Sequence, residues 1–167
     1  MLDIFSIPKL KHLSIKNKTA LSLYPWKNCR PDKMAALTTP LYMANVAIIS
    51  SAGLYIKNEQ ESFDTKIKGG DYSFREITKD VNLSQFKDGH RSGSFDHTGL
   101  RADPSGVMPI PQLIQLAEEG MIGKVNHRHF SVMGSILAPI RFVKKTIPEI
   151  IQKLKEDNVQ IALLIPV

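Results

Sequence analysis

The 167-residue chain contains one cysteine, Cys29. A single thiol can form neither an internal disulfide nor a cysteine-rich zinc site, so a reducing, cytoplasmic setting is expected. No stretch approaches the ~20 consecutive apolar residues that a membrane-spanning helix needs. The first residues also lack the basic and apolar regions of a secretory signal. The sequence therefore predicts a cytoplasmic protein without a membrane segment.

Signatures of several common enzyme classes are also missing. There is no G-x-S-x-G segment for a serine hydrolase and no G-x-G-x-x-G segment after a strand. Gly69-Gly70-Asp71 is not followed by the Lys-Ser/Thr pair of a phosphate-binding loop. His127 and His129 would face the same side of a strand, but no third metal ligand has a convincing spacing. We therefore expect no metal and no cofactor.

Positive charge is concentrated at the start of the chain. Residues 1–33 hold seven basic and two acidic residues, whereas the remainder holds 15 basic and 14 acidic residues. A solvated arm explains this better than a nucleic-acid interface, although RNA binding through residues 1–33 remains a weaker hypothesis that demands steep salt dependence. We predict a basic lead-in arm over 1–30 and one α/β domain over 31–167.

The pattern of apolar residues predicts the main elements of that domain. Strands are expected at 45–51, 74–77, 125–132 and 161–167, and helices at 112–119 and 146–158. Thr146 to Glu149 has capping-box spacing, which starts the second helix at Thr146. The apolar run 161–167 indicates an interior strand covered on both faces. The prediction is a three-layer, mostly parallel sheet, Rossmann- or flavodoxin-like, incomplete at the C-terminus.

A ligand site is expected where the strands end. In open α/β sheets ligands bind beyond the carboxyl ends of the strands. After the strand at 45–51 comes a turn of small residues, Ser50, Ser51, Ala52 and Gly53. Small residues let the backbone approach a ligand, or simply make a tight turn.

The polar middle of the chain supplies the candidates for chemistry. It contains two imidazoles, a guanidinium and two carboxylates, punctuated by glycines: His90, Arg91, Asp96, His97 and Asp103. Such a loop can place an acid/base pair or grip a carboxylate through arginine. The alternative is a surface loop whose aspartates cap turns.

Five stretches, in order, resemble one family. They are Val46–Leu54, Gly70–Ile77, Asp96–Gly99 with Asp103-Pro104, Glu119–Gly123 and His129–Gly134. Their order and spacing are similar to the selenoprotein B family of glycine, sarcosine and betaine reductases. That family also includes the selenoprotein subunit of D-proline reductase. The resemblance runs from about Trp26 to the end of the chain.

The resemblance implies an oxidoreductase subunit that reductively cleaves a C–N bond of a glycine-, betaine- or proline-like substrate. In the family, a strand ending much like Leu164–Val167 is followed directly by a redox motif that begins with selenocysteine or cysteine, the nucleophile. The present sequence lacks that motif. A selenocysteine codon read as a stop, or a truncation, would explain this equally well.

The resemblance also implies roles for individual residues. His90, Asp96 and His129 are the acid/base or orienting candidates. Arg91 and the backbone of the turn from Ser50 to Gly53 are expected to hold a substrate carboxylate. The expected partners are a small amino-acid-like substrate, other subunits of a reductase complex and further copies of the chain. The alternative is a non-catalytic binding or scaffold subunit, complete as given, whose last strand lies at a sheet edge.

Overall fold

The computed structural model describes residues 14–23, 35–93 and 95–167. The chain divides into two compact units, residues 1–36 and 37–167. In the first unit the described part is essentially the helix α1 (Ile15–Leu23). Most of the predicted basic arm, together with Cys29 and Trp26, lies outside the described residues. No helix in the described ranges has the length and apolar character to cross a membrane.

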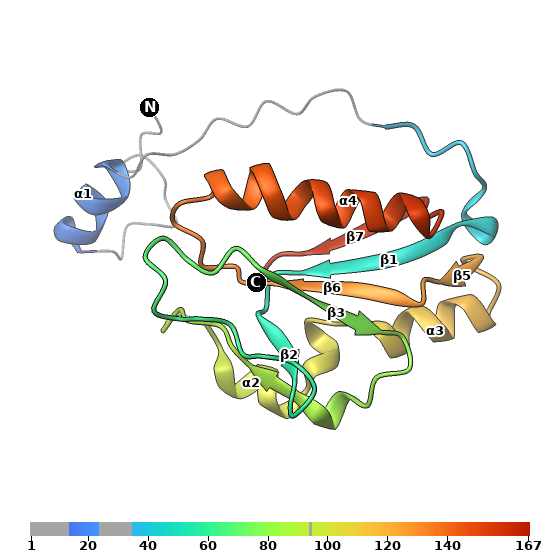
Figure 1. The fold of residues 1–167 in the computed structure, drawn as a ribbon, viewed down its shortest axis with the longest axis horizontal. Coiled ribbons are helices and arrows are strands. Elements are labelled where there is room, and N and C mark those ends of the chain that lie inside the picture. The colour runs from blue at the N-terminus through green and yellow to red at the C-terminus, as the bar shows by residue number, and fades with distance from the viewer. Residues whose placement is uncertain (1–13, 24–34, 94) are drawn as a thin grey trace. The chain divides into compact units, whose positions relative to one another are not determined.

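The second unit contains both strands and helices (Figure 1). Its strands are β1 (Asn45–Ser50), β2 (Leu54–Ile56), β3 (Phe74–Thr78), β4 (Phe86–Asp88), β5 (Lys124–Val125), β6 (Arg128–Val132) and β7 (Ile161–Ile165). Its α-helices are α2 (His97–Ala102), α3 (Ile110–Glu118) and α4 (Ile147–Glu156). Short 3-10 turns span Leu41–Met43, Leu83–Gln85 and Pro104–Gly106, and a wider π-type turn, Phe142–Thr146, leads into α4.

The main sheet is mixed, with β1 at its centre. β1 pairs in parallel with β7 along one edge and with β5 and β6 along the other. β3 runs antiparallel to β6, and β2 and β4 form a separate antiparallel pair. This confirms an α/β fold with parallel strands. The closer likeness to Rossmann or flavodoxin folds stays a prediction.

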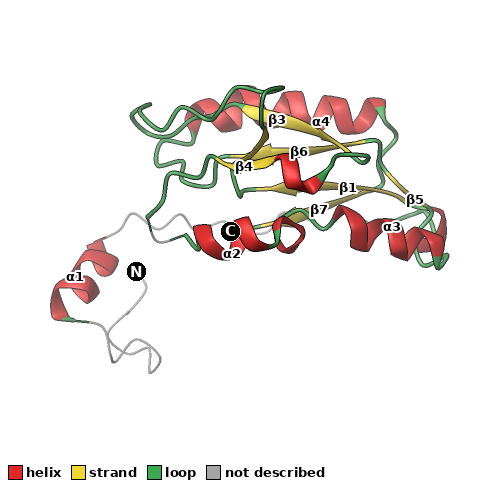
Figure 2. Cartoon of the chain, turned by 90° about the horizontal axis from the view of Figure 1, so that it is seen from below, coloured by secondary structure: helices red, strands yellow, loops and turns green. Residues whose placement is uncertain are grey.

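Helices pack on both faces of this sheet, as the two perpendicular views show (Figures 1 and 2). Val46 and Ile48 of β1 join a buried cluster with Leu113 of α3. Ile49 points the other way and packs with Phe130 and with residues of α4. Because successive side chains of a strand alternate between faces, the apolar run of β1 supplies both clusters.

The prediction that 161–167 is an interior strand covered on both faces is wrong. Among the described residues β7 pairs with β1 alone, so it is an edge strand. Leu164 is 65% exposed and Leu163 is 36% exposed. An apolar run records how apolar a strand is, but the number of neighbouring strands depends on the remainder of the fold.

The two ends of the helix α4 compare differently with the sequence prediction. Thr146 precedes the first residue of α4 as predicted, but it makes no side-chain capping hydrogen bond, because its backbone is already helical and its hydroxyl donates to the Tyr72 carbonyl. The expected end is confirmed, since Asn158 has a positive φ of 53°. Gly120, with a φ of 72°, ends α3 in the same way.

Ion pairs fasten the end of α4 to the sheet. Arg128 donates two short hydrogen bonds to Asp157, from Nε to Oδ2 at 2.6 Å and from Nη2 to Oδ1 at 2.7 Å. Asn126 Nδ2 adds a third hydrogen bond to Asp157 Oδ2, at 2.8 Å. Burial alone would raise the pKa of Asp157, but the hydrogen bonds from Arg128 and Asn126 outweigh it and lower that pKa below 3.8. Asp157 therefore stabilises the fold only while it is ionised.

Replacing this carboxylate tests the network. We expect Asp157→Asn to lower the free energy of unfolding at pH 7 by about 2 kcal/mol, because Arg128 loses a charged, bidentate partner. Because the folded-state pKa is depressed, this contribution is present above 3.8 and is lost as the pH falls through the lower folded value. Urea unfolding at several pH values measures it. Asp80→Asn, at an exposed carboxylate, is the control and should change little; equal losses from both variants would contradict the role of the network.

Candidate functional site

The turn after β1 is tied to the two neighbouring strands. Ser51 N donates a hydrogen bond to the Ile165 carbonyl of β7 at 3.0 Å, and Gly53 N donates to the Val132 carbonyl of β6 at 3.0 Å. Ser50 is fully buried, and its hydroxyl accepts a hydrogen bond from Ala52 N. The small residues therefore form a fixed turn at the carboxyl end of β1.

The end of β7 also lies at this turn. Val167 N donates a hydrogen bond to Ser51 Oγ at 2.9 Å. The adjacency that the sequence suggested, between the last residues and the small-residue turn, is thus present. An apolar hollow of about 390 Å³ borders the same place, lined by Ser51, Ile165 and Pro166 on one side and by residues of α4 on the other.

His90 lies against the same turn from a third direction. Gly134 follows β6, and a Cβ added to it would lie 2.7 Å from the Ser51 carbonyl oxygen and 3.1 Å from His90 Nε2. A Cβ added to Gly53 would lie 3.1 Å from His90 N. Glycines at 53 and 134 therefore allow His90 to approach the carboxyl ends of β1 and β6.

The hydrogen bonds of His90 define its protonation state. Ser92 N donates to His90 Nδ1 at 3.3 Å, and His90 N donates to Asp88 Oδ1 at 3.0 Å. Burial lowers the pKa of His90, an effect that Asp88 partly opposes and His97 reinforces. A neutral ring whose Nδ1 accepts must carry its proton on Nε2. That nitrogen is buried and has no hydrogen-bond partner in the described residues.

A buried N–H without an acceptor is an unusual feature that catalytic sites often contain. His90 is only 8% exposed, so the unpaired donor is not simply hydrated at the surface. A neutral imidazole can donate a hydrogen bond to an anion, and His90 could do so through Nε2. The Nε2 of His129 is also buried and unpaired in the described residues, so what distinguishes His90 is its packing beside the turn at Gly53.

Behind His90 lies a charged cluster that sequence reasoning assembled only in part. Asp88, whose side chain is 4% exposed, accepts from His97 Nδ1 at 2.5 Å and from Arg101 Nη2 at 3.3 Å. His97 was visible among the polar residues of the loop, but Asp88 was missed. No spacing rule marks Asp88, because β4 and α2 are brought together by the fold. Asp88 and Arg101 also line a hollow of about 690 Å³.

Asp96 and His129 occupy positions with evident structural duties. The Asp96 carboxylate caps α2 by accepting from Thr98 N and Gly99 N at 3.1 and 2.9 Å. His129 is fully buried, and its Nδ1 accepts from Ile48 N at 3.0 Å. Ile48 lies between the residues of β1 that pair with β5 and those that pair with β6. Burial, reinforced by His127, lowers the pKa of His129 to about 4. No printed contact of the described residues joins either side chain to His90, so their catalytic assignments stay predictions.

Arg91 is adjacent to His90 and half-buried. Its Nη1 donates to the Ile67 carbonyl at 3.0 Å, and no carboxylate pairs with it among the described residues. The guanidinium thus keeps donors that could meet a substrate carboxylate. No group of three metal-ligating side chains occurs in the described part of the chain.

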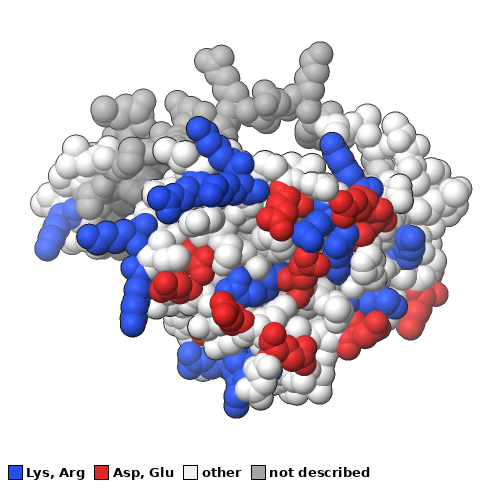
Figure 3. All heavy atoms as spheres, viewed as in Figure 1, with Lys and Arg blue, Asp and Glu red and all other residues white. Residues whose placement is uncertain are grey.

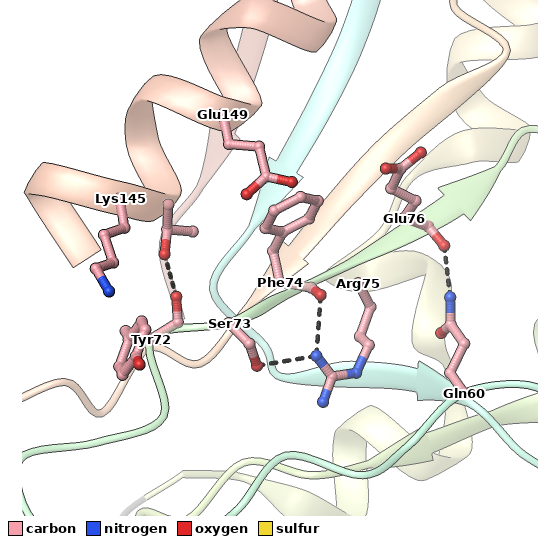
Figure 4. A pocket seen from close by; sticks show the side chains of 9 residues that line it. Gln60, Tyr72, Ser73, Phe74, Arg75, Glu76, Lys145 and Glu149 are labelled. Atoms are coloured by element: carbon pink, nitrogen blue, oxygen red, sulfur yellow. Dashed lines mark hydrogen bonds between the residues drawn. The ribbon is translucent and has the colours of Figure 1, made fainter. Parts of the chain in front are cut away.

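A different hollow, of about 560 Å³, lies along β3 and contains none of the predicted site residues (Figure 4). Figure 4 shows the guanidinium of Arg75 beside Ser73 and Phe74; its Nη1 donates to Ser73 Oγ and to the Phe74 carbonyl, both at 2.9 Å. Lys145 and Glu149 border it from the helical side. On the face shown in Figure 3, acidic and basic side chains are interspersed, so no patch of one charge marks a binding surface there. Because the hollow along β3 contains none of the predicted site residues, we place the candidate site at the strand ends.

The close packing of the turn against His90 can be tested with two matched glycines. Gly53 and Gly120 have φ values of 65° and 72°, but a Cβ at Gly120 would meet no atom within 4 Å. We expect Gly120→Ala to cost about 1 kcal/mol of unfolding free energy for the backbone alone. Gly53→Ala should cost roughly 1 kcal/mol more because the methyl group is forced against His90. Urea unfolding measures both, and equal losses would show that the approach of His90 is not tight.

Comparison with known proteins gives a consistent result. The family model for glycine/sarcosine/betaine reductase selenoprotein B matches residues 13–166. D-proline reductase subunit gamma of Acetoanaerobium sticklandii is 30% identical over 134 residues, which cover 80% of this chain and 53% of that protein. Glycine reductase complex component B subunit gamma of Carboxydothermus hydrogenoformans is 27% identical over 97 residues, 57% of this chain and 22% of that protein.

The corresponding subunit of Symbiobacterium thermophilum is 26% identical over 123 residues, 71% of this chain and 28% of that protein. No solved structure is similar enough to match. The matched part is thus about half the length of the D-proline reductase subunit and between a fifth and a third of the glycine reductase subunits. Since the family model spans nearly the whole sequence, the chain belongs to the glycine/sarcosine/betaine reductase selenoprotein B family.

Proposed function

We propose that this chain forms the substrate-pocket part of a reductase-complex subunit that cleaves a C–N bond of a small amino-acid-like substrate. The observation that carries the proposal is the meeting of three features: the end of β7 at Ser51, the small-residue turn, and the unpaired Nε2 of His90. Membership of the family supplies the class of reaction.

The proposed roles follow the chemistry of the groups. Arg91 would bind the substrate carboxylate. The turn Ser50, Ser51, Ala52 and Gly53 would form a wall of the pocket, because the N–H groups of Ser51, Ala52 and Gly53 already donate within the protein. The nucleophile would be a selenocysteine or cysteine outside this sequence, adjoining Val167. Asp96 and His129 remain proposed orienting groups. The other complex subunits, further copies of the chain and a cytoplasmic location belong to the same proposal.

The proposed cleavage has two steps, attack on carbon and release by a dithiol. A selenolate or thiolate attacks the carbon that bears nitrogen, so that a carbon–chalcogen bond forms as the C–N bond breaks. The ammonium or quaternary nitrogen leaves as a neutral amine with the bonding electron pair, while the N–H at His90 Nε2 donates a hydrogen bond to the substrate anion. A dithiol then attacks the chalcogen, and the released carbon takes a proton to form a C–H bond. The dithiol is oxidised to a disulfide, and the substrate carbon is reduced.

The test is a dithiol-dependent assay of the complete subunit with its complex partners. Glycine, betaine and D-proline are supplied in turn, and the free amine or the ring-opened amino acid is measured. The proposal predicts product with at least one of the three, and only when dithiol is present. Absence of product from all three, with an intact assembled complex, would overturn it.

A non-catalytic scaffold subunit is the second candidate, and the position of β7 favours it. That hypothesis predicted a last strand at a sheet edge, and β7 has no second neighbouring strand among the described residues. A scaffold would assemble with reductase subunits, yet turnover would survive changes at His90. The assay separates the two candidates, because only the catalytic subunit loses activity with its pocket residues.

A further inference from the structure

We propose that His97 is a positioning residue: its imidazolium bridges Asp88 and the Ser92 carbonyl and so holds His90 in one tautomer. The use of that tautomer in reductive cleavage rests on the proposed function. The bridge itself does not, because it is a property of the folded chain.

The geometry requires both nitrogens of His97 to carry hydrogen. Nδ1 lies 2.5 Å from Asp88 Oδ2, and Nε2 lies 2.9 Å from the Ser92 carbonyl oxygen. A carboxylate and a carbonyl can only accept, so a neutral ring could satisfy one of them and would turn a lone pair toward the other. The arrangement therefore selects the charged form of His97.

The two groups that His97 binds are the ones that hold His90. Asp88 accepts the His90 N–H through Oδ1 while its Oδ2 accepts from His97. Ser92 donates its N–H to His90 Nδ1 while its carbonyl accepts from His97. His97 thus binds the carboxylate that accepts from His90 N and the carbonyl of the residue whose N–H faces the His90 ring. Restraining Ser92 from its carbonyl side favours the hydrogen bond of its N–H to His90 Nδ1, which keeps the proton of His90 on Nε2.

The charges around His97 come from two elements and the intervening loop. Asp88 at the end of β4 favours the imidazolium, whereas Arg101 of α2 opposes it. The ring centroids of His90 and Phe95 lie 6.3 and 5.2 Å from the centroid of the His97 ring. The hydrogen bond to Asp88, followed by the one to Ser92, raises the pKa of His97 above 6.5, whereas burial lowers that of His90. One imidazole is held charged and its neighbour neutral, as acid/base sites require.

This arrangement makes the site sensitive to alkaline pH. Because the folded-state pKa of His97 is raised, its stabilising contribution is present below 6.5 and is lost as the pH rises through the folded value. Deprotonation removes one hydrogen bond, either to Asp88 or to Ser92. Loss of the hydrogen bond to the Ser92 carbonyl weakens the restraint on Ser92, and His90 can then place its proton on either nitrogen.

The test is nitrogen NMR of the imidazole rings in the 167-residue chain between pH 5 and 9, which reports protonation and tautomer directly. The proposal predicts that at pH 7 His97 carries two protons and His90 one, on Nε2. His97→Gln should convert His90 to a mixture of tautomers, and Asp88→Asn should lower the pKa of His97. His127→Gln, at an exposed histidine, should change neither.

Neutral His97 at pH 7, or an unchanged His90 tautomer in a folded His97→Gln variant, would overturn the proposal. If that variant does not fold, the titration of the unaltered chain decides, because His97 must then lose its proton above pH 6.5. These readouts need no turnover. Correct tautomers in a complex without reductase activity would overturn the proposed function and leave the bridge intact.

Discussion

Replacing His90 by leucine is expected to lower kcat/KM of the complete reductase at least about 100-fold, the usual contribution of one positioned hydrogen-bond donor to an anion. Leucine fills similar space but has no N–H to donate. The unpaired Nε2 of His90 and the packing of His90 beside Gly53 and Gly134 are the reasons to expect so large an effect. Steady-state assays with the best substrate of the three measure it.

His127→Leu is the matched control, since it makes the same chemical change at a side chain that is 65% exposed and pairs with Asp157 at 3.8 Å. It should leave kcat/KM unchanged. Thermal unfolding of both variants must show that they remain folded. Full activity of a folded His90→Leu enzyme would remove His90 from the mechanism and favour the scaffold hypothesis.

Phe130→Ala is expected to lower the free energy of unfolding by about 3–5 kcal/mol, the range for a phenylalanine deleted from a core. Phe130 is fully buried in β6, its ring meets Phe74 edge-on with centroids 5.7 Å apart, and it packs with Ile150 of α4. Its removal leaves a cavity between the sheet and α4. Urea unfolding followed by circular dichroism measures the loss.

The control for this prediction is Leu137→Ala, because Leu137 is 68% exposed. Its change should lie within about 0.5 kcal/mol of the unaltered chain. A loss below about 1 kcal/mol for Phe130→Ala would mean that α4 does not pack on this face of the sheet. The shared support of β6 and α4 would then no longer explain how the strand ends are held in place.

The periodicity of apolar residues predicted an element well where the apolar face that it specifies is the face that packs against the sheet or a helix. The β-branched run at the start of β1 and the apolar stripe of α4 each bury a face that their periodicity specifies. The burial of β7 could not be predicted in the same way. Its residues are at least as apolar as those of β1, but in the described part of the chain β1 has strands on both sides whereas β7 pairs with β1 alone.

The candidate site was predictable as a region and not as a set of contacts. The turn at Ser51 follows from the rule on strand ends, and His90 from the resemblance. The pairing of Asp88 with His97 depends on how β4 approaches α2, which no residue pattern encodes. Nor could the sequence show that Asp96 caps a helix or that the His129 ring accepts the backbone N–H of Ile48.

NMR mapping of carboxylate binding tests the central claim most directly. Glycine, betaine and D-proline are each titrated into the isotopically labelled chain while backbone amides and imidazole nitrogens are followed. The account predicts saturable shifts at Ser51, Gly53 and Arg91, and at Nε2 of His90, with at least one of the three. Shifts confined to the hollow around Tyr72 and Arg75, or no saturable shift with any of them, would contradict it.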